Sequence, residues 1–243
     1  MTLLPSTKTR LSRPFNVTAL IEAILMSGTA ALLVVKWQYG TLAYYIHPRY
    51  TVLVLLAALV LFLMGGVRLH DMFTPSNRRP GGLHLLLALP LLLGVVVPAQ
   101  PLGATTLAGR GLELNNTPIP WQQPIEGDPT TWNLLQWSMA LAVRGEALQG
   151  EPIDVVGFVF QDERIGHDAF FVGRYVITCC AADGSATGLP VQWPNGETLP
   201  VDTWVQVQGT LTKMTMVNGI TIPAIAATSV EPVAQPESPY LFP

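Results

Sequence analysis

The chain has 243 residues, of which 49% are hydrophobic and 12% are charged, and its formal net charge is −3. Ordinary soluble domains hold about 25% charged residues, so this composition excludes a typical soluble protein. The net charge is also unevenly distributed, because residues 1–100 carry +6 and the remainder carries −9. The acidic remainder would repel a phosphate backbone, which excludes nucleic acid as a partner.

Three apolar stretches lie within residues 1–100, at residues 17–35, 51–67 and 83–99. Crossing the hydrocarbon core of a bilayer takes about 20 apolar residues in a helix. The first stretch is interrupted by Glu22 and the third by Pro90. We predict a membrane region with three spans, the third having a re-entrant or interfacial segment as its alternative. A cleaved signal peptide is the alternative for the first.

The orientation follows from the basic residues in the short connections. The leader and the second connection each hold three of them, whereas the first connection, residues 36–50, holds two. They are Lys8, Arg10 and Arg13 in the leader, Arg68, Arg78 and Arg79 in the second connection, and Lys36 and Arg49 in the first. This bias predicts a multi-pass protein of the cell membrane with a cytoplasmic N-terminus and an extracytoplasmic C-terminal domain.

Glu22 is the only acidic residue within a predicted span. An ionised carboxylate in the bilayer is costly, so we expect it to reach toward the cytoplasmic surface or to contact a helix of another membrane protein. One to two turns further along, the small residues Ser27, Gly28, Ala30 and Ala31 offer a surface that a partner helix could approach closely.

Residues 101–150 are expected to form a linker and a short helix. Residues 98–129 are rich in Pro, Gly, Thr and Asn, as linkers are. Apolar residues then recur at helical spacing from Trp132 to Val143, and Thr130 or Thr131 could cap the start of that helix. The helix is expected to pack on the following domain or to lie along the membrane.

Residues 151–243 show the pattern of β-strands. Stretches rich in Val, Ile, Phe, Tyr and Thr lie at residues 153–160, 169–178, 204–212 and 220–225. Asn218 and Gly219 predict a hairpin with a type I′ turn, and Gly157 and Gly209 stand where bends are needed. Five or six short strands in this length favour a small antiparallel barrel, like the oligonucleotide-binding (OB) fold, over a sandwich.

Cys179 and Cys180 are the only cysteines, and they are adjacent. Soft thiolates suit zinc or monovalent copper, so we predict a metal site of Cys179, Cys180, Asp183 and His167. In a regular strand the two thiols would point to opposite faces, so both can bind only if the strand ends or bulges near Cys180. The alternatives are buried, inert cysteines in a structural scaffold, or a thiol-dependent enzyme that uses Cys180 with His167 as its base. No third orienting group or nucleophile elbow supports the enzyme.

Several segments resemble the YcgQ-like family of uncharacterised bacterial membrane proteins, and the resemblance covers nearly the whole chain. They are the three spans and the sequences Val97-Pro98-Ala99, Gly157-Phe158-Val159-Phe160, Arg174-Tyr175-Val176-Ile177-Thr178-Cys179-Cys180-Ala181-Ala182-Asp183, Trp204-Val205-Gln206-Val207-Gln208-Gly209 and Pro239-Tyr240-Leu241-Phe242-Pro243. The resemblance implies a subunit that works with a multi-span permease of unknown substrate. The function expected is therefore that of a membrane-anchored accessory subunit, and not that of an enzyme. A scaffold or cap on a membrane partner is the alternative.

Overall fold

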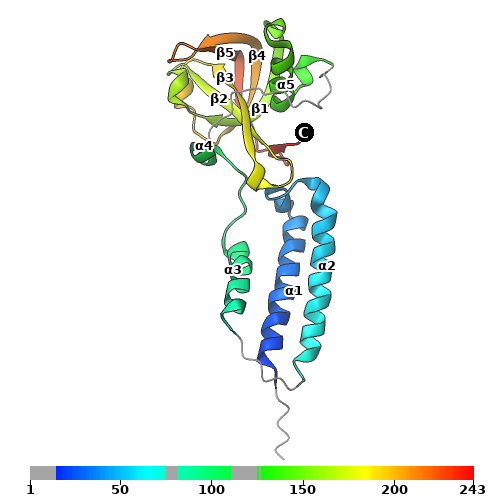
Figure 1. Ribbon diagram of the computed structural model, residues 1–243. Coiled ribbons are helices and arrows are strands. Elements are labelled where there is room, and N and C mark those ends of the chain that lie inside the picture. Colours follow the sequence, from blue (N-terminus) through cyan, green and yellow to red (C-terminus); the bar gives the residue numbers. More distant parts are fainter. Residues whose placement is uncertain (1–14, 75–80, 111–124, 126) are drawn as a thin grey trace, which may run out of the picture. The chain divides into compact units, whose positions relative to one another are not determined.

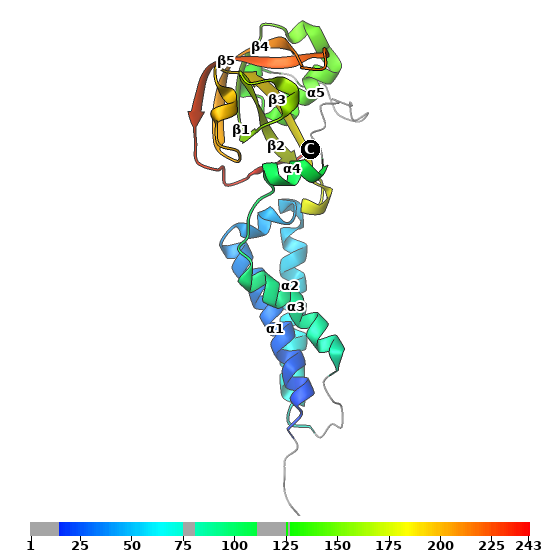
Figure 2. The same ribbon diagram turned by 90° about the vertical axis from the view of Figure 1, so that its left-hand side faces the viewer.

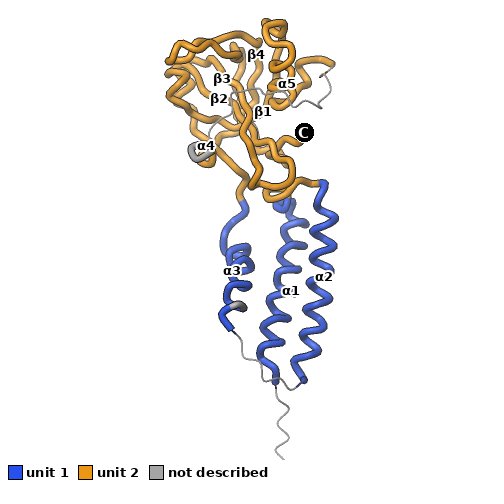
Figure 3. Tube along the Cα trace, viewed as in Figure 1, with its two compact units in different colours: residues 1–42, 49–99 blue, residues 43–48, 100–243 orange. Residues whose placement is uncertain are grey.

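The computed structural model describes residues 15–74, 81–110, 125 and 127–243. The chain divides into two compact units, which Figure 3 colours separately. Unit 1 comprises Met1–Leu42 and Arg49–Ala99, and unit 2 comprises Ala43–Pro48 and Gln100–Pro243. The basic residues of the leader and Arg78 and Arg79, on which the predicted orientation depends, lie outside the described residues.

The described part of unit 1 contains three apolar α-helices, α1 (Val17–Gln38), α2 (Thr51–Asp71) and α3 (Gly82–Val96). The first two run side by side (Figures 1 and 2). Among the described residues, α1 and α2 are long and apolar enough to cross a membrane, whereas α3 is a shorter apolar helix that contains Pro90. Two spans are therefore supported, and the third stays a prediction.

The small residues of α1 pack against helices of this same chain. Gly28 faces Leu91 of α3, where an added Cβ would lie 3.0 Å from a methyl carbon. On α2, a Cβ at Gly65 would lie 2.3 Å from the Oγ of Ser27. The small residues predicted that a partner helix could approach closely. Within unit 1, α2 and α3 are the helices that do so.

Glu22 has polar partners on both other helices. One carboxylate oxygen lies 3.1 Å from the Nε of Arg68 on α2, and the other lies 3.3 Å from the Nε2 of His84 on α3. Neither sequence-based account of Glu22 included a partner from within the chain. Intramembrane carboxylates pair with nearby polar groups because an isolated charge is costly there.

Among the described residues of unit 2, two α-helices precede the strands. Helix α4 (Ala104–Arg110) lies in the predicted linker, and α5 (Leu134–Arg144) matches the predicted short helix. The cap of α5 is Asn133, whose side chain accepts hydrogen bonds from the N–H groups of Leu135 and Gln136. The expected caps Thr130 and Thr131 instead belong to a preceding 3₁₀ turn, because Asn133 is the residue next to the first helical turn.

The β domain is a closed five-stranded barrel with a short sixth strand. Its strands are β1 (Pro152–Phe160), β2 (Ala169–Val176), β3 (Ser185–Gln192), β4 (Trp204–Thr215), β5 (Thr221–Pro232) and β6 (Tyr240–Leu241). The order around the barrel is β1-β2-β3-β5-β4, and β4 pairs again with β1. All of these pairings are antiparallel except that of β3 with β5, and β6 joins β2 in parallel. Figures 1 and 2 show the strands wrapped around one interior.

Two local predictions concern the long β4–β5 hairpin. Its register shifts between Gln208 and Gly209, and a Cβ at Gly209 would lie 2.2 Å from a backbone oxygen of β5. The bend expected at Gly209 is therefore a β-bulge. The hairpin at Asn218 and Gly219 is also present, but only Gly219 has a positive φ, +83°. The type I′ prediction is wrong, since that turn needs positive φ at both central residues.

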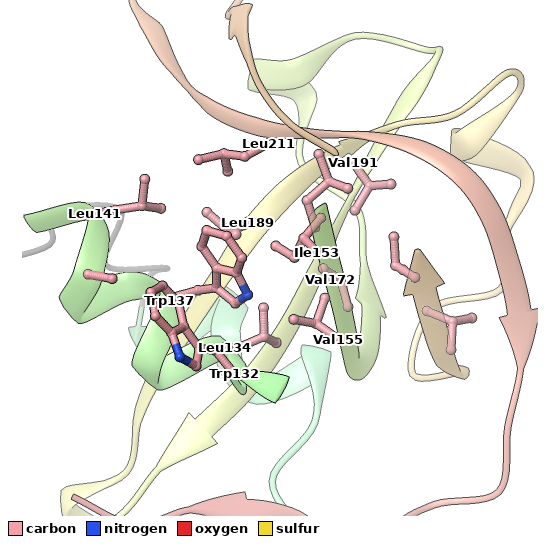
Figure 4. Packing of buried hydrophobic residues seen from close by; sticks show 14 of the residues in the cluster. Trp132, Leu134, Trp137, Leu141, Ile153, Val155, Val172, Leu189, Val191 and Leu211 are labelled. Atoms are coloured by element: carbon pink, nitrogen blue, oxygen red, sulfur yellow. The ribbon is translucent and has the colours of Figure 1, made fainter. Parts of the chain in front are cut away.

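Helix α5 closes the main core of the barrel. Trp137 is fully buried and packs edge-on against Trp132, with ring centroids 5.1 Å apart. Figure 4 shows both indoles and Leu134 facing Ile153 and Leu189 of the barrel. The helix thus packs on the following domain, which was the first of the two expectations for it.

Candidate functional site

The two cysteines lie in a loop that begins where β2 ends. β2 stops at Val176, three residues before Cys179, and a 3₁₀ turn follows at Ala181–Asp183. The Asp183 carboxylate holds the loop by accepting the N–H groups of Thr178 at 3.1 Å and of Cys179 at 2.7 Å. Short polar side chains that bond to nearby backbone groups favour such turns over a continuing strand. Asp183 therefore shapes the loop that presents the thiols.

Both thiols point to one side. The Sγ atoms of Cys179 and Cys180 are 3.7 Å apart, and both cysteines are free thiols. The face-to-face alternation of a strand does not apply, because the strand has already ended. Cys179 is exposed and Cys180 is half-buried, so the alternative in which the pair is buried and inert is wrong about burial.

The Asp183 carboxylate also sets the acidity of Cys179. A hydrogen bond to Asp183 and, next, one to Cys180 raise the pKa of the Cys179 thiol from its ordinary 9.0 to about 11. For Asp183 itself, partial desolvation opposes ionisation, but hydrogen bonds from Cys179 and Thr178 outweigh it and lower the pKa. At neutral pH the loop thus presents a protonated Cys179 beside a carboxylate.

His167 lies at the opposite end of β2. It precedes that strand and the cysteines follow it, and eight strand residues cover about 26 Å at 3.3 Å each. Its Nδ1 is paired with the Glu197 carboxylate, which raises the pKa of His167. The structure thus brings Asp183 to the thiols and leaves His167 away from them. Within the described ranges, no group of three or more His, Cys, Asp or Glu side chains could hold a metal ion.

Nothing in the sequence predicts that residues 43–48 pack against the cysteine loop. Ile46 and Cys180 form an antiparallel β-bridge. The N–H of His47 donates to the carbonyl oxygen of Cys179 at 2.9 Å, and the N–H of Ala181 donates to that of Tyr45 at 2.8 Å. This short segment connects α1 to α2 in the chain, yet it belongs to unit 2 (Figure 3).

Further contacts fix the two ends of this segment. The Tyr240 hydroxyl donates to the carbonyl oxygen of Tyr44, and the Gln235 side chain donates to the Tyr44 hydroxyl, both at 3.2 Å. At the other end, the His47 and Phe242 rings lie 4.4 Å apart. We call residues 43–48 the docked segment.

Comparison with known proteins shows what the region of the site is similar to. Residues 130–243, which include α5, the barrel and the cysteine loop, match the family model of the DUF1980 C-terminal domain. The UPF0703 protein YcgQ of Bacillus subtilis (strain 168) is 29% identical over 99 residues, which cover 40% of this chain and 34% of YcgQ. The resemblance to the YcgQ-like family is confirmed.

A second relative matches over nearly its whole length. It is a protein of Streptococcus mutans named "Putative two-component membrane permease complex subunit", and it is 21% identical over 271 residues, 92% of this chain and 99% of that protein. No solved structure matches the chain. These relatives are named as a permease complex subunit or by an uncharacterised family, not as enzymes.

Proposed function

We propose that this YcgQ-like chain is an accessory subunit of a multi-span permease, anchored by three spans, with its β domain on the extracytoplasmic side. The naming of the Streptococcus mutans relative supports the permease partner, because that match extends over 92% of the chain. Two described helices suited to a membrane support the anchor.

The proposed topology rests on one observation, which is that the docked segment belongs to unit 2. If α1 and α2 both span, residues 43–48 emerge on the side opposite the N-terminus. Residues 100–243 form one compact unit with that segment, so they must lie on the same side. The chain leaves α2 on the N-terminal side, and α3 must therefore carry it across a third time.

The short length of α3 is compatible with this third crossing. Its fifteen residues rise about 22 Å as a helix, and the apolar residues 97–99 extend the stretch. A bilayer adapts to a short span by local thinning at modest cost. The basic leader favours the cytoplasmic side for the N-terminus. After three crossings, the barrel is then extracytoplasmic.

The barrel itself supports an OB-like scaffold. Its closed order β1-β2-β3-β5-β4, with one parallel pairing between β3 and β5, favours a small five-stranded Greek-key barrel of the OB type. The net charge of −9 beyond residue 100 opposes a nucleic-acid ligand, so we assign the barrel to protein contacts with the permease.

A soft-metal site is the second candidate function, favoured by the 3.7 Å separation of the Sγ atoms of Cys179 and Cys180. Two thiolates on one side suit monovalent copper better than zinc, because structural zinc takes four ligands. Asp183 lies next to the pair, whereas His167 is left out of this site. The metal would have to displace the Cys179 proton, since the pKa of that thiol is about 11. Equal copper content in the wild type and in the variant with Cys179→Ser and Cys180→Ser would exclude this candidate.

Single-cysteine probing tests the topology. In a background that carries Cys179→Ser and Cys180→Ser, Val217→Cys places a thiol at the exposed tip of the β4–β5 hairpin, and Thr74→Cys places one just after α2. A membrane-impermeant maleimide on intact cells should label Val217→Cys, and should label Thr74→Cys only after lysis. Labelling of both, or of Thr74→Cys alone, on intact cells would refute the proposed topology.

Co-purification tests the partner. The chain, tagged at its C-terminus and extracted from native membranes in mild detergent, should retain a multi-span permease in stoichiometric amount. A truncated chain that ends at residue 99 keeps the helices and lacks the barrel, and it should lose that permease if the barrel makes the contact. Recovery of the full chain alone, after crosslinking in the membrane, would contradict the proposal.

A further inference from the structure

The peptide bond between Cys179 and Cys180 takes part in two interactions at once. It joins the two residues whose sulfur atoms lie 3.7 Å apart, and its carbonyl oxygen accepts the N–H of His47 in the docked segment. The second bond of that bridge, from Ala181 to Tyr45, starts at the residue after the pair. The thiol pair is therefore flanked by the two backbone hydrogen bonds that attach the docked segment.

We propose that Cys179 and Cys180 form a thiol–disulfide exchange site, and that closure to a vicinal disulfide releases residues 43–48 from the β domain. The inference rests on the proposed extracytoplasmic location, because disulfides form and persist in oxidising compartments.

The geometry couples the two events. A disulfide requires the sulfur atoms to approach from 3.7 Å to about 2.05 Å. Neighbouring Cα atoms are about 3.8 Å apart across a trans peptide, which is shorter than the 4.4–6.8 Å usual between disulfide-linked residues. The covalent chain fixes that separation, so the ring closes only if the Cys179–Cys180 peptide, which lies inside it, rotates and twists out of its relaxed geometry. Twisting that peptide turns its carbonyl oxygen away from the His47 N–H and shifts the backbone of Ala181.

The exchange is a balanced two-electron step with an organic disulfide as the oxidant. One thiolate of the pair attacks a sulfur of the oxidant, forms a mixed disulfide and releases one thiolate. The second thiol of the pair loses its proton and attacks the first cysteine, which releases the second thiolate. The two protons from the pair end on the two released thiolates. The pair loses two electrons, and the oxidant gains them.

The surroundings of the pair indicate which disulfides react fastest. Cys179 is exposed and its neighbour Asp183 is a carboxylate of lowered pKa, so an approaching anion is repelled and a cation is attracted. Cystamine, a cationic disulfide, should therefore react faster than the anionic oxidised glutathione, and this difference should shrink as salt is added.

The test uses the full chain in lipid nanodiscs, with cystamine as the probe. After oxidation, the intact mass of the wild type should fall by two hydrogen atoms, whereas Cys179→Ser and Cys180→Ser should each gain one cysteamine adduct. The amide hydrogens of His47 in the docked segment and of Ala181 in the cysteine loop should each exchange about tenfold faster or more in the oxidised wild type, since the two backbone hydrogen bonds that they donate are lost. The double variant should show no change on oxidation.

Peptides from the β1–β4 pairing serve as an internal control, and their exchange should be equal in both states. The proposal is overturned if cystamine leaves only stable adducts on the wild type, or if the ring closes while exchange of residues 43–48 stays unchanged. Both measurements are made on the purified chain, so they can fail while the labelling of Val217→Cys still supports the proposed topology.

Discussion

Replacing Asp183 by Asn should make Cys179 a faster nucleophile. The Asp183 carboxylate is the main cause that raises the pKa of Cys179 to about 11, and Cys180 is the second. An Asn amide can still accept a backbone N–H through its oxygen, but it carries no negative charge. The variant is therefore expected to keep one of the two backbone hydrogen bonds that hold the loop, from Thr178 or from Cys179, and to lower the pKa of Cys179 toward 9.0.

The size of the effect follows from two opposing factors. Because Cys180 also contributes to the shift, removing the carboxylate lowers the pKa by at most about two units, which raises the thiolate fraction at neutral pH by at most about 100-fold. The thiolate of a more acidic thiol is intrinsically less nucleophilic, by about tenfold over two units at a Brønsted coefficient of 0.4–0.5. The net expectation is that alkylation of Cys179 at pH 7 becomes faster, by at most about tenfold.

The assay compares Asp183→Asn with the parent chain in a Cys180→Ser background, so that Cys179 is the only thiol. Alkylation by iodoacetamide is followed by mass spectrometry from pH 7 to pH 11. The parent rate should keep rising through pH 10, and the Asn variant should level off near pH 9. Asp162→Asn, which removes a carboxylate that is paired with Arg164, is the matched control and should leave the rate unchanged. Superimposable pH profiles for parent and variant would refute the role of the carboxylate.

Three further substitutions test the fold. Asn133→Ala should lower the free energy of unfolding of the β domain by about 1 kcal/mol because it removes the cap of α5, whereas Thr131→Ala should cost less, as measured by chemical denaturation. Trp137→Ala should cost about 3–5 kcal/mol in the same assay, since the indole is fully buried, and a loss below 1 kcal/mol would contradict the packing. Gly65→Ala should lower the thermal stability of the helical region in detergent, because its Cβ would lie 2.3 Å from a side-chain oxygen of α1. Gly66→Ala meets nothing within 4 Å and should not lower it, which circular dichroism can check.

The sequence predicted the elements that have a strong local pattern. The apolar stretches at 17–35 and 51–67 became α1 and α2, and β1 and β4 lie where Val-rich segments alternate with turns. By contrast, β3 was not among the four strands named from the pattern. It contains Gly188 and Pro190, two residues that normally mark turns. Its place in the barrel is set by pairing with β2 and β5, which a local pattern does not encode.

The cysteine loop could be predicted only in part, because some of its contacts are local in the sequence and others are not. The adjacency of the thiols and the nearness of Asp183 can be seen in the sequence, because both are local. The docked segment lies more than 130 residues away from the cysteines along the chain, and its main attachment is between backbone groups. Every residue but proline carries the same backbone donor and acceptor, so such a contact leaves no signature in residue type.

This backbone attachment gives the adjacency of the cysteines a physical meaning. In a Cys-x-x-Cys pair, the oxidised ring spans several peptide bonds, and closure needs little distortion of any one of them. In this chain the ring contains a single peptide bond, and that bond supplies the oxygen which receives His47. Strain from ring closure is therefore concentrated on one of the groups that attach the docked segment. A variant with Ala182→Cys and Cys180→Ser has a Cys-x-x-Cys spacing. It should consequently oxidise more readily while residues 43–48 keep their protection from hydrogen exchange. If that variant releases the segment as the wild type does, the shared peptide bond is not the cause.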